Sequence, residues 1–258
     1  DISFTLGPRI NAAGRMDHAQ RVVDLLMEKS DVRASEMARE IEEMNHQRRE
    51  VDEMTTAEAL MKLEKTPEEP FCNIVYGTDW HRGVVGIVAS RIIEHRYRPS
   101  VVLSEENGVL IGSARSVDGV DIHQALETCE DLLIQFGGHT MAAGLSLDLK
   151  HLEAFKERLN EAVKTQLNGM PPRPIIRCDR EVHISELALE ALKELEQLEP
   201  FGPGNATPVF ILRNVVSVRP PRTIGNQGRH LKITICDPEF EGVAIDAIGW
   251  NMGELPPQ

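Results

Sequence analysis

The stretch GGHTMAAG, residues 137–144, constrains both the fold and the function more than any other part of the sequence. Gly137 and Gly138 carry no Cβ atom, so the backbone can turn sharply here and approach another group closely. His139 follows at once, and imidazole takes up or releases a proton near neutral pH. Residues 141–143 favour a short helical turn, whose free N–H groups would attract an anion such as phosphate. The stretch therefore predicts a phosphate site, and a glycine turn with a hydrogen-bonded histidine is the plainer alternative.

Regular elements flank this stretch and indicate an α/β unit over residues 70–168. Strands and helices are distinguished by apolar spacing, with a turn at Asn107-Gly108 between two strands. The strands are expected over 71–76, 100–104 and 109–113, and the helices over 81–95, 122–133 and 149–167.

The residues before this unit predict one long helix. Residues 6–16 (LGPRINAAGRM) contain Pro and two Gly and are expected to form a loop, followed by a short helix over 22–27. Residues 32–65 lack Pro and Gly and would span roughly 50 Å as a helix. The apolar residues of this segment recur near one helical stripe: Met37, Ile41, Met44, Val51 and Met61. We expect a solvated connector between domains, with a coiled coil as the alternative.

The residues after a Pro-rich linker at 168–174 predict a small β-barrel. Short segments of strand character alternate with turn residues, which is the pattern of such barrels. A strand is expected over 175–182, a helix over 185–198, a turn-rich run over 200–205, and strands over 209–212, 215–219, 230–236 and 243–249. The sequence stops at Pro256-Pro257-Gln258, and an incomplete barrel is the alternative.

Composition is typical of a globular protein, with 41% hydrophobic and 27% charged residues among 258. No segment approaches the roughly 20 apolar residues that span a bilayer, and no signal peptide is visible, so we expect no membrane association. The four cysteines are Cys72, Cys129, Cys178 and Cys236. Their wide spacing indicates neither a zinc site nor a disulfide framework, which favours reduced thiols and a cytoplasmic location. The sequence begins at Asp1 without a methionine, and we expect it to be part of a longer protein.

Charge is distributed unevenly along the chain. The net charge of −13 argues against a general nucleic-acid coat. Residues 31–69 hold 12 acidic and 6 basic residues, nearly half of the excess. In contrast, residues 200–236 contain no acidic residue but include Arg213, Arg219, Arg222, Arg229 and Lys232. This local basic segment could bind phosphates within an acidic protein.

Three further groups of residues are candidates for phosphate contacts. Ser113 and Arg115 lie two apart on an expected strand, so they share a face, and both can donate to phosphate. His81 precedes an expected helix that begins HRGVVG, where a phosphate could sit, although we expect Gly83 and Gly86 to serve close packing of this helix on the sheet. The third group lies in the expected N-terminal loop and could bind a sugar-phosphate backbone or form interdomain ion pairs: Arg9, Asn11 and Arg15.

No group of Asp and His residues in this sequence shows a spacing typical of metal ligands. Many nucleases and phosphatases use two metal ions held by such residues. If the protein performs phosphate chemistry, we therefore expect most of the catalytic groups to lie upstream of Asp1.

Together these motifs resemble the RecJ family of single-stranded-DNA exonucleases, within the DHH phosphoesterase superfamily. LGPRINAAGRMD resembles the end of the DHH catalytic domain, WHRGVVGIVASRI, GSARS and GGHTMAAG resemble the DHHA1 domain, and PFGPGN resembles the OB-fold domain. The resemblance covers nearly the whole chain. It implies an α/β fold in four parts: the end of the DHH domain over 1–30, a long connecting helix and linker over 31–69, DHHA1 over 70–168, and an OB-fold domain over 175–258.

The resemblance also implies a reaction. Proteins of this family release 5′-mononucleotides from single-stranded DNA during repair and recombination, using Mn²⁺ or Mg²⁺ held by the DHH domain. It implies that Ser113 and Arg115 bind the terminal 5′ phosphate, that His139 faces the scissile phosphate as a catalytic residue, and that Arg9, Asn11, Arg15, His81, Gly137 and Gly138 line the cleft. The ligands of the metal would precede residue 1, so the chain alone is expected to be inactive.

The same resemblance implies that the OB-fold domain holds the incoming strand. Such domains combine a basic groove with stacking aromatic residues. The basic residues are Arg219, Arg222, Arg229 and Lys232, whereas aromatic residues are scarce and the nearest are Phe201, Phe210 and Trp250. Electrostatic contact with the backbone is therefore a firmer expectation than base stacking. The implied partners are single-stranded DNA, a single-stranded-DNA-binding protein and a helicase, with the protein a monomer.

Three other interpretations remain open at this point. A DHH–DHHA1 phosphodiesterase acting on cyclic dinucleotides or very short RNAs would share the glycine-histidine motif but would not need the residues from 175 on. The chain could instead be only a binding module for single-stranded nucleic acid. Alternatively, the long acidic helix could drive oligomerisation.

Overall fold

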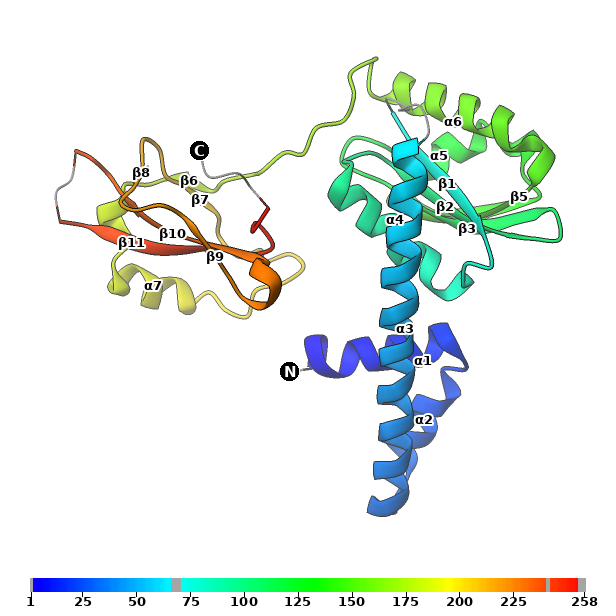
Figure 1. Ribbon diagram of the computed structural model, residues 1–258, viewed down its shortest axis with the longest axis horizontal. Coiled ribbons are helices and arrows are strands. Elements are labelled where there is room, and N and C mark those ends of the chain that lie inside the picture. The colour runs from blue at the N-terminus through cyan, green and yellow to red at the C-terminus, as the bar shows by residue number, and fades with distance from the viewer. Residues whose placement is uncertain (1, 66–70, 240–241, 255–258) are drawn as a thin grey trace. The chain divides into compact units, whose positions relative to one another are not determined.

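The computed structural model describes residues 2–65, 71–239 and 242–254. The chain divides into two compact units, Asp1–Pro174 and Ile175–Gln258 (Figure 1). The first unit contains one sheet of five strands, and the second contains two smaller sheets.

The first unit begins with helices, where a loop over 6–16 was expected. A π-helical turn, Ile2–Leu6, leads into α1 (Gly7–Met16), which is followed by α2 (Gln20–Met27). The expectation of a loop is wrong because Pro8 lies in the first turn of α1, where its missing N–H has no intrahelical partner to lose. Arg15 in the last turn also favours the helix through its dipole.

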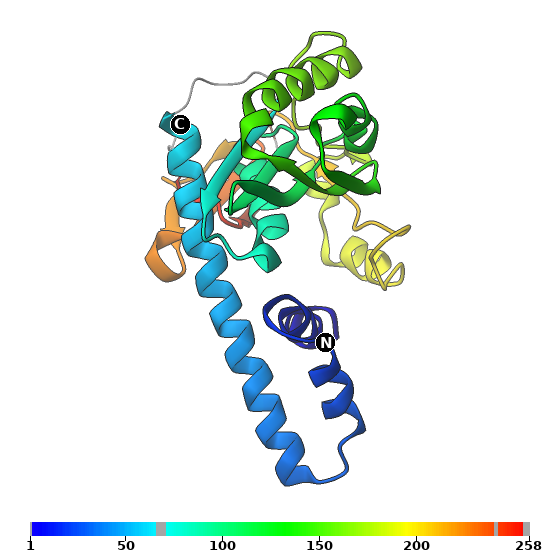
Figure 2. The same cartoon turned by 90° about the vertical axis from the view of Figure 1, so that its right-hand side faces the viewer.

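The predicted long helix is confirmed as α3 (Asp31–Lys65), but it is not simply solvated. Ile41 packs against Ala13 and Val22 of the first two helices, and Ala59 and Leu63 pack under the sheet and its covering helix. Between these two apolar ends the buried positions are polar. Figure 2 shows α3 passing from α1 and α2 at one end to the sheet at the other. The expected apolar stripe is only partly right, because Met61 is 52% exposed.

A five-stranded sheet forms the centre of the first unit, in the order β1-β2-β3-β5-β4. Strands β1 and β2 are parallel and the other pairs are antiparallel. The strands are β1 (Asn73–Thr78), β2 (Ser100–Glu106), β3 (Val109–Arg115), β4 (Gln135–His139) and β5 (Ala142–Asp148), and the helices are α4 (Arg82–His95), α5 (Ile122–Glu127) and α6 (Leu152–Gln166).

The two faces of this sheet are covered differently. One face, including Leu110, Ala114 and Leu147, packs with Phe155 and Leu159 of α6 into the main core. Burial of each of these leucine and phenylalanine side chains contributes about 1.5–3 kcal/mol relative to exposure. On the other face, α4 packs over β2 and β3. This face is exposed over β5 and β4, because no comparable helix of the described ranges covers it there.

Two expectations for this unit need correction. The helical turn expected over 141–143 is wrong: β4 and β5 form a hairpin, and Ala142 is already in β5. Alternation explains this, since Ala143, Leu145 and Leu147 are buried while the residues between them are not. The helix expected over 122–133 ends at Glu127 and continues as a separate 3-10 turn, Glu130–Leu132.

The second unit contains two small sheets and one α-helix among its described residues. One sheet has the order β11-β10-β8, with β9 also paired to β10, and the other is the β6-β7 pair. The elements are β6 (Arg180–Glu181), α7 (Leu189–Glu196), β7 (Phe210–Ile211), β8 (Val216–Ser217), β9 (Arg222–Ile224), β10 (His230–Cys236) and β11 (Ala244–Gly249). As far as the structure describes them, these sheets do not close into the expected barrel. Among the described residues of this unit, Ile184 is the one hydrophobic side chain that is buried.

Candidate phosphate and nucleic-acid site

The candidate site of the first unit is the face of the sheet that α4 leaves partly open. Strand register places Arg115 opposite Ala142, and Ala142 opposite His139. Residues paired directly across strands share a face, and strands lie about 4.8 Å apart, so His139 lies roughly 10 Å from Arg115 on the same face. Ser113 lies two residues before Arg115 and therefore also on this face. The structure thus brings together three of the predicted site residues.

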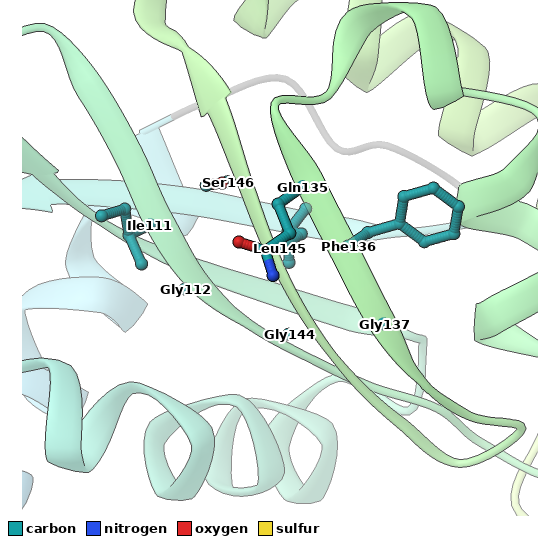
Figure 3. Close-up of a pocket in the computed structure, with 8 residues that line it drawn as sticks. All are labelled: Ile111, Gly112, Gln135, Phe136, Gly137, Gly144, Leu145 and Ser146. Carbon is teal, nitrogen blue, oxygen red and sulfur yellow. The ribbon is translucent and has the colours of Figure 1, made fainter.

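The cross-strand row that contains Ser113 has glycine on both of the next two strands, β5 and β4. Ser113 pairs with Gly144, and Gly144 pairs with Gly137. A Cβ atom on Gly137 would meet no atom within 4 Å. Beside this row lies a hollow of about 400 Å³ (Figure 3). It is lined by Ile111, Gly112, Gln135, Phe136, Gly137, Gly144, Leu145 and Ser146.

Gly138 is required by the hairpin rather than by a ligand. Its φ is +154°, and a Cβ atom there would lie 2.3 Å from the carbonyl oxygen of Ala142. His139 and Thr140 follow at the exposed end of the hairpin. The hydroxyl of Thr140 donates to Asp121, the N-terminal cap of α5, at 3.0 Å. This bond ties the hairpin end to α5 and holds the backbone that carries His139.

Two arginines meet near the start of α4. The Nη1 atom of Arg15 donates to the carbonyl oxygen of Gly83 at 3.1 Å, and Nη1 of Arg115 donates to the carbonyl of Ala114 at 2.8 Å. Burial lowers the pKa of Arg115, and the charge of Arg15 lowers it further. Within the described part of the chain, neither guanidinium pairs with a carboxylate. Two repelling cations without an acidic partner favour the binding of an anion.

His81 caps α4 at Gly83, the residue whose carbonyl accepts the bond from Arg15. Its Nδ1 atom accepts a hydrogen bond from the N–H of Gly83 at 3.0 Å. The imidazole therefore occupies one of the free N–H groups that an anion at this helix start would use. The side chain is otherwise exposed to solvent and can still contact a ligand through its other ring nitrogen.

The residues of α1 do not all point to this site. Arg9 forms an ion pair with Glu42 of α3 and also donates to the carbonyl of Thr5. Asn11 lies four residues before Arg15 and so on the same side of α1, whereas Arg9 is about 200° away from Asn11 around the helix. The structure thus brings Asn11 and Arg15 together and places Arg9 against α3.

A buried polar group joins α3 to α4, and the sequence pattern did not reveal it. Asp52 is fully buried and accepts from Nη2 of Arg91 at 2.9 Å, and Nη1 of Arg48 lies 3.6 Å from the same oxygen. Arg48 also donates to Asn45 at 3.1 Å. Burial lowers the pKa of Arg48, and Asp52 opposes this shift. A spacing of three or four residues could have indicated the inward face of α3, but the residues in the middle of that face are polar. The positions on this face are Ile41, Asn45, Arg48, Asp52, Thr55, Ala59 and Leu63.

Three of the predicted basic residues of the second unit, Arg219, Arg222 and Lys232, gather on one face of its larger sheet. Arg222 pairs with Lys232 across β9 and β10. Asp246 on β11 lies 2.7 Å from Nζ of Lys232 and 3.4 Å from Nη2 of Arg219, and it accepts from Thr234. Its bonds to Lys232 and Thr234 lower the pKa of Asp246 to about 2. Asp246 lies outside the segment 200–236 that contains no acidic residue, and its charge offsets those of Lys232 and Arg219.

Arg222 and Arg229 have no such partner within the described residues. An aromatic pair lies beside this face, because the rings of His230 and Trp250 meet edge-on with centroids 4.8 Å apart. Trp250 is 67% exposed. His230 and Lys232 alternate onto the same face of β10. Lys232 thus shares a face with His230, whose ring contacts the exposed Trp250, and single strands are bound by basic and aromatic side chains together.

We expect replacement of Arg222 by alanine to weaken binding of single-stranded DNA by this chain. Loss of one phosphate contact should reduce the slope of log affinity against log salt by about 0.7. A titration of a labelled oligonucleotide at several salt concentrations measures both quantities. Arg213→Ala is the matched control, since Arg213 is already paired with Glu181 at 2.8 Å. Equal changes in the two variants would show that only net charge matters.

Two further findings bear on the kind of protein. No group of three His, Cys, Asp or Glu residues that could hold a metal ion occurs in the described ranges. None of the helices described here is both long enough and apolar enough to cross a membrane.

Comparison with known proteins identifies both units. Residues 69–165 match the DHHA1 domain, and residues 178–258 match the RecJ OB domain. The single-stranded-DNA-specific exonuclease RecJ of Bacillus subtilis is 36% identical over 256 residues, covering 98% of this chain and 32% of that protein. The protein of the same name from Haemophilus influenzae is 33% identical over 261 residues, covering 98% of this chain and 45% of that protein.

A solved structure extends the likeness to the fold. The crystal structure of RecJ in complex with Mg²⁺ from Thermus thermophilus matches with a TM-score of 0.80 and 29% identity, covering 99% of this chain and 39% of that one. A second structure of that protein, in complex with Mn²⁺, matches with a TM-score of 0.79. This chain therefore spans less than half of the length of each of the two curated relatives. With a DHHA1 domain followed by a RecJ OB domain, the chain belongs to the RecJ family.

Proposed function

We propose that this chain supplies the DNA-gripping and 5′-phosphate-binding side of a metal-dependent exonuclease that degrades single-stranded DNA from its 5′ end. The observation that carries the proposal is the shared sheet face of Ser113, Arg115 and His139, with Arg15 nearby. Two guanidinium groups without a carboxylate partner among the described residues suit a phosphate dianion. The relatives named single-stranded-DNA-specific exonuclease support the substrate.

Each residue of the site has a proposed role. The hydroxyl of Ser113 and the guanidinium of Arg115 bind the terminal 5′ phosphate, which selects the end of the strand. His139 lies roughly 10 Å away on the same face, as the strand spacing gives, and contacts the scissile phosphate or its neighbour. The spacing of consecutive phosphates along a single strand does not exceed this separation of Arg115 and His139, so the two residues can contact neighbouring phosphates. The glycine row between them leaves room for the strand to lie against the backbone.

The metal ion belongs to another part of the proposed enzyme. The two Thermus thermophilus structures are complexes with Mg²⁺ and with Mn²⁺. The described residues of this chain do not fit a metal site, since they include no cluster of three suitable ligands.

The remaining parts of the chain follow from the same proposal. Residues 1–30 would form the C-terminal end of the DHH domain, and residues 31–69 would connect it to the DHHA1 domain at 70–168. The OB domain at 175–258 would hold the incoming strand. A cytoplasmic location, a monomeric state, and a single-stranded-DNA-binding protein and a helicase as partners belong to the proposal as well. The match to the RecJ OB domain favours a long strand over the cyclic dinucleotides or very short RNAs of the alternative phosphodiesterase.

We expect the full-length protein to release mononucleotides from 5′-phosphorylated single strands, and this chain alone to bind such strands without hydrolysing them. The described residues of the chain lack a group of metal ligands, which explains the expected difference. Nucleotide release in the presence of Mn²⁺, followed by chromatography, measures both. Robust turnover by the pure chain, or a preference of the full-length protein for cyclic dinucleotides, would contradict the proposal.

A further inference from the structure

Two glycines lie in the first two turns of α4, at positions 83 and 86. Glycine destabilises a helix relative to alanine, because the unfolded chain has more freedom to lose. From the sequence, both glycines were expected to bring the helix close to the sheet. The structure shows a different neighbour for each of them.

Gly86 faces the candidate phosphate site. A Cβ atom at this position would lie 2.7 Å from Nη2 of Arg115 and 3.3 Å from Oγ of Ser113. Both atoms are ones that the proposed function assigns to the terminal phosphate. The absent side chain therefore leaves the space in which the guanidinium lies beside the serine hydroxyl.

Gly83 serves the other arginine. A Cβ atom there would lie 2.2 Å from the carbonyl oxygen of Arg15. Arg15 belongs to the last turn of α1, so this turn packs directly against the first turn of α4. The same contact includes the bond from Nη1 of Arg15 to the carbonyl of Gly83. Glycine at 83 thus lets the backbone of Arg15 approach, and glycine at 86 makes room for the side chain of Arg115.

We propose that Gly86 is a specificity-determining residue of the 5′-phosphate site, which acts by seating the guanidinium of Arg115 next to Ser113 and within range of Arg15. This inference rests on the proposed function of the same site. It adds a residue from α4 that would not touch the phosphate itself and acts only through Arg115.

Alanine is expected to have different consequences at the two positions, because Gly86 faces side-chain atoms and Gly83 faces backbone atoms. The atom close to Gly86 is the end of a flexible side chain, so alanine can be accommodated if the guanidinium moves. The atom close to Gly83 is backbone, so alanine there would displace α1 itself. Substitution at 86 should therefore alter the site and leave the fold in place.

The test is Gly86→Ala in the full-length protein. We expect the ratio of kcat/KM for a 5′-phosphorylated strand to that for the same 5′-hydroxyl strand to fall roughly tenfold, as for the loss of one charge-assisted hydrogen bond. The midpoint of thermal unfolding should not fall, because alanine is the better helix former. Gly14→Ala is the matched control: its Cβ atom would lie 3.6 Å from Cβ of Ala19, an ordinary contact, and the ratio should not change.

A double-mutant cycle with Arg115→Ala distinguishes the possible outcomes. If Gly86 acts through Arg115, adding Gly86→Ala to Arg115→Ala lowers the ratio no further. A ratio unchanged by Gly86→Ala but lowered by Arg115→Ala would overturn this inference and leave the proposed function standing. A ratio unchanged by Arg115→Ala as well would instead remove the proposed function. A fall in the unfolding midpoint of Gly86→Ala below that of Gly14→Ala would show that Gly86 is a packing glycine and would also overturn the inference.

Discussion

Replacement of Arg115 by alanine in the full-length protein is expected to lower the preference for a 5′-phosphorylated strand over a 5′-hydroxyl strand by roughly 10- to 100-fold. The guanidinium is partly buried, and its position beside Ser113 allows two parallel bonds to one phosphate. Arg15 remains in the variant and keeps part of the attraction. The ratio of kcat/KM for the two strands, measured in competition, gives the preference directly.

Arg115→Lys is the informative companion to this variant. Lysine keeps the charge but loses the planar fork, so the preference should lie between those of the native protein and the alanine variant. Binding of a 5′-hydroxyl strand should change little in either variant, since that strand lacks the terminal phosphate. If the alanine variant kept the native preference, Arg115 would not be part of the phosphate pocket.

Replacement of Asp52 by alanine is expected to lower the free energy of unfolding of the first unit by about 3 kcal/mol. Asp52 is fully buried and is the one carboxylate in the described chain that lies within 4 Å of Arg48 or Arg91. Its loss leaves two guanidinium groups without an acidic acceptor at the junction of α3 and α4. Arg91 is partly exposed and can turn to water, which limits the effect to the lower end of the range for a broken buried pair.

Urea unfolding followed by tryptophan fluorescence measures this effect. The two tryptophans are Trp80, which is buried in the first unit, and Trp250 in the second. In a Trp250→Phe background the signal reports the first unit alone. Glu53→Ala is the matched control, because Glu53 is exposed on the same helix and should change stability by no more than about 0.5 kcal/mol. A loss below about 1 kcal/mol for Asp52→Ala would mean that water already solvates this group.

The buried Asp52 and the glycines Gly83 and Gly86 both affect the position of α4. The bonds of Asp52 hold α4 to α3, while Gly83 and Gly86 lie at the end of α4 that faces the arginines. Arg15 reaches this end from α1, which itself packs on α3. The position of the proposed phosphate site therefore depends on three helices that lie outside the glycine-histidine hairpin.

Much of the local structure followed from the sequence. The long helix, the strand that precedes α4, and the β2–β3 hairpin were predicted, because apolar spacing and the turn Asn107-Gly108 are local signals. The shared face of Ser113 and Arg115 also followed, since side chains two apart on a strand point the same way. Helix α1 does not follow from the local pattern, because Pro and Gly residues are typical of loops.

The hairpin at 135–148 shows where local reasoning fails. Met141, Ala142 and Ala143 have good helix propensity, yet they form a turn and the start of β5. Pairing with β3 and burial of Ala143 and Leu145 outweigh a propensity of at most about a few tenths of a kcal/mol per residue. The helical turn predicted over 141–143 is therefore wrong, although Ser113, Arg115 and His139 still share a face of the sheet.

The sequence alone determined the long helix, the β2–β3 hairpin, the position of the glycine-histidine motif, and which side chains of one strand share a face, because each of these depends on residues a few positions apart. The tertiary structure decided that Arg9 pairs with Glu42, that Asp246 offsets Lys232, and that Gly86 makes room for Arg115. These partners are separated by 14 to 33 positions in the chain. Strand order and helix packing, which no local period encodes, bring them together.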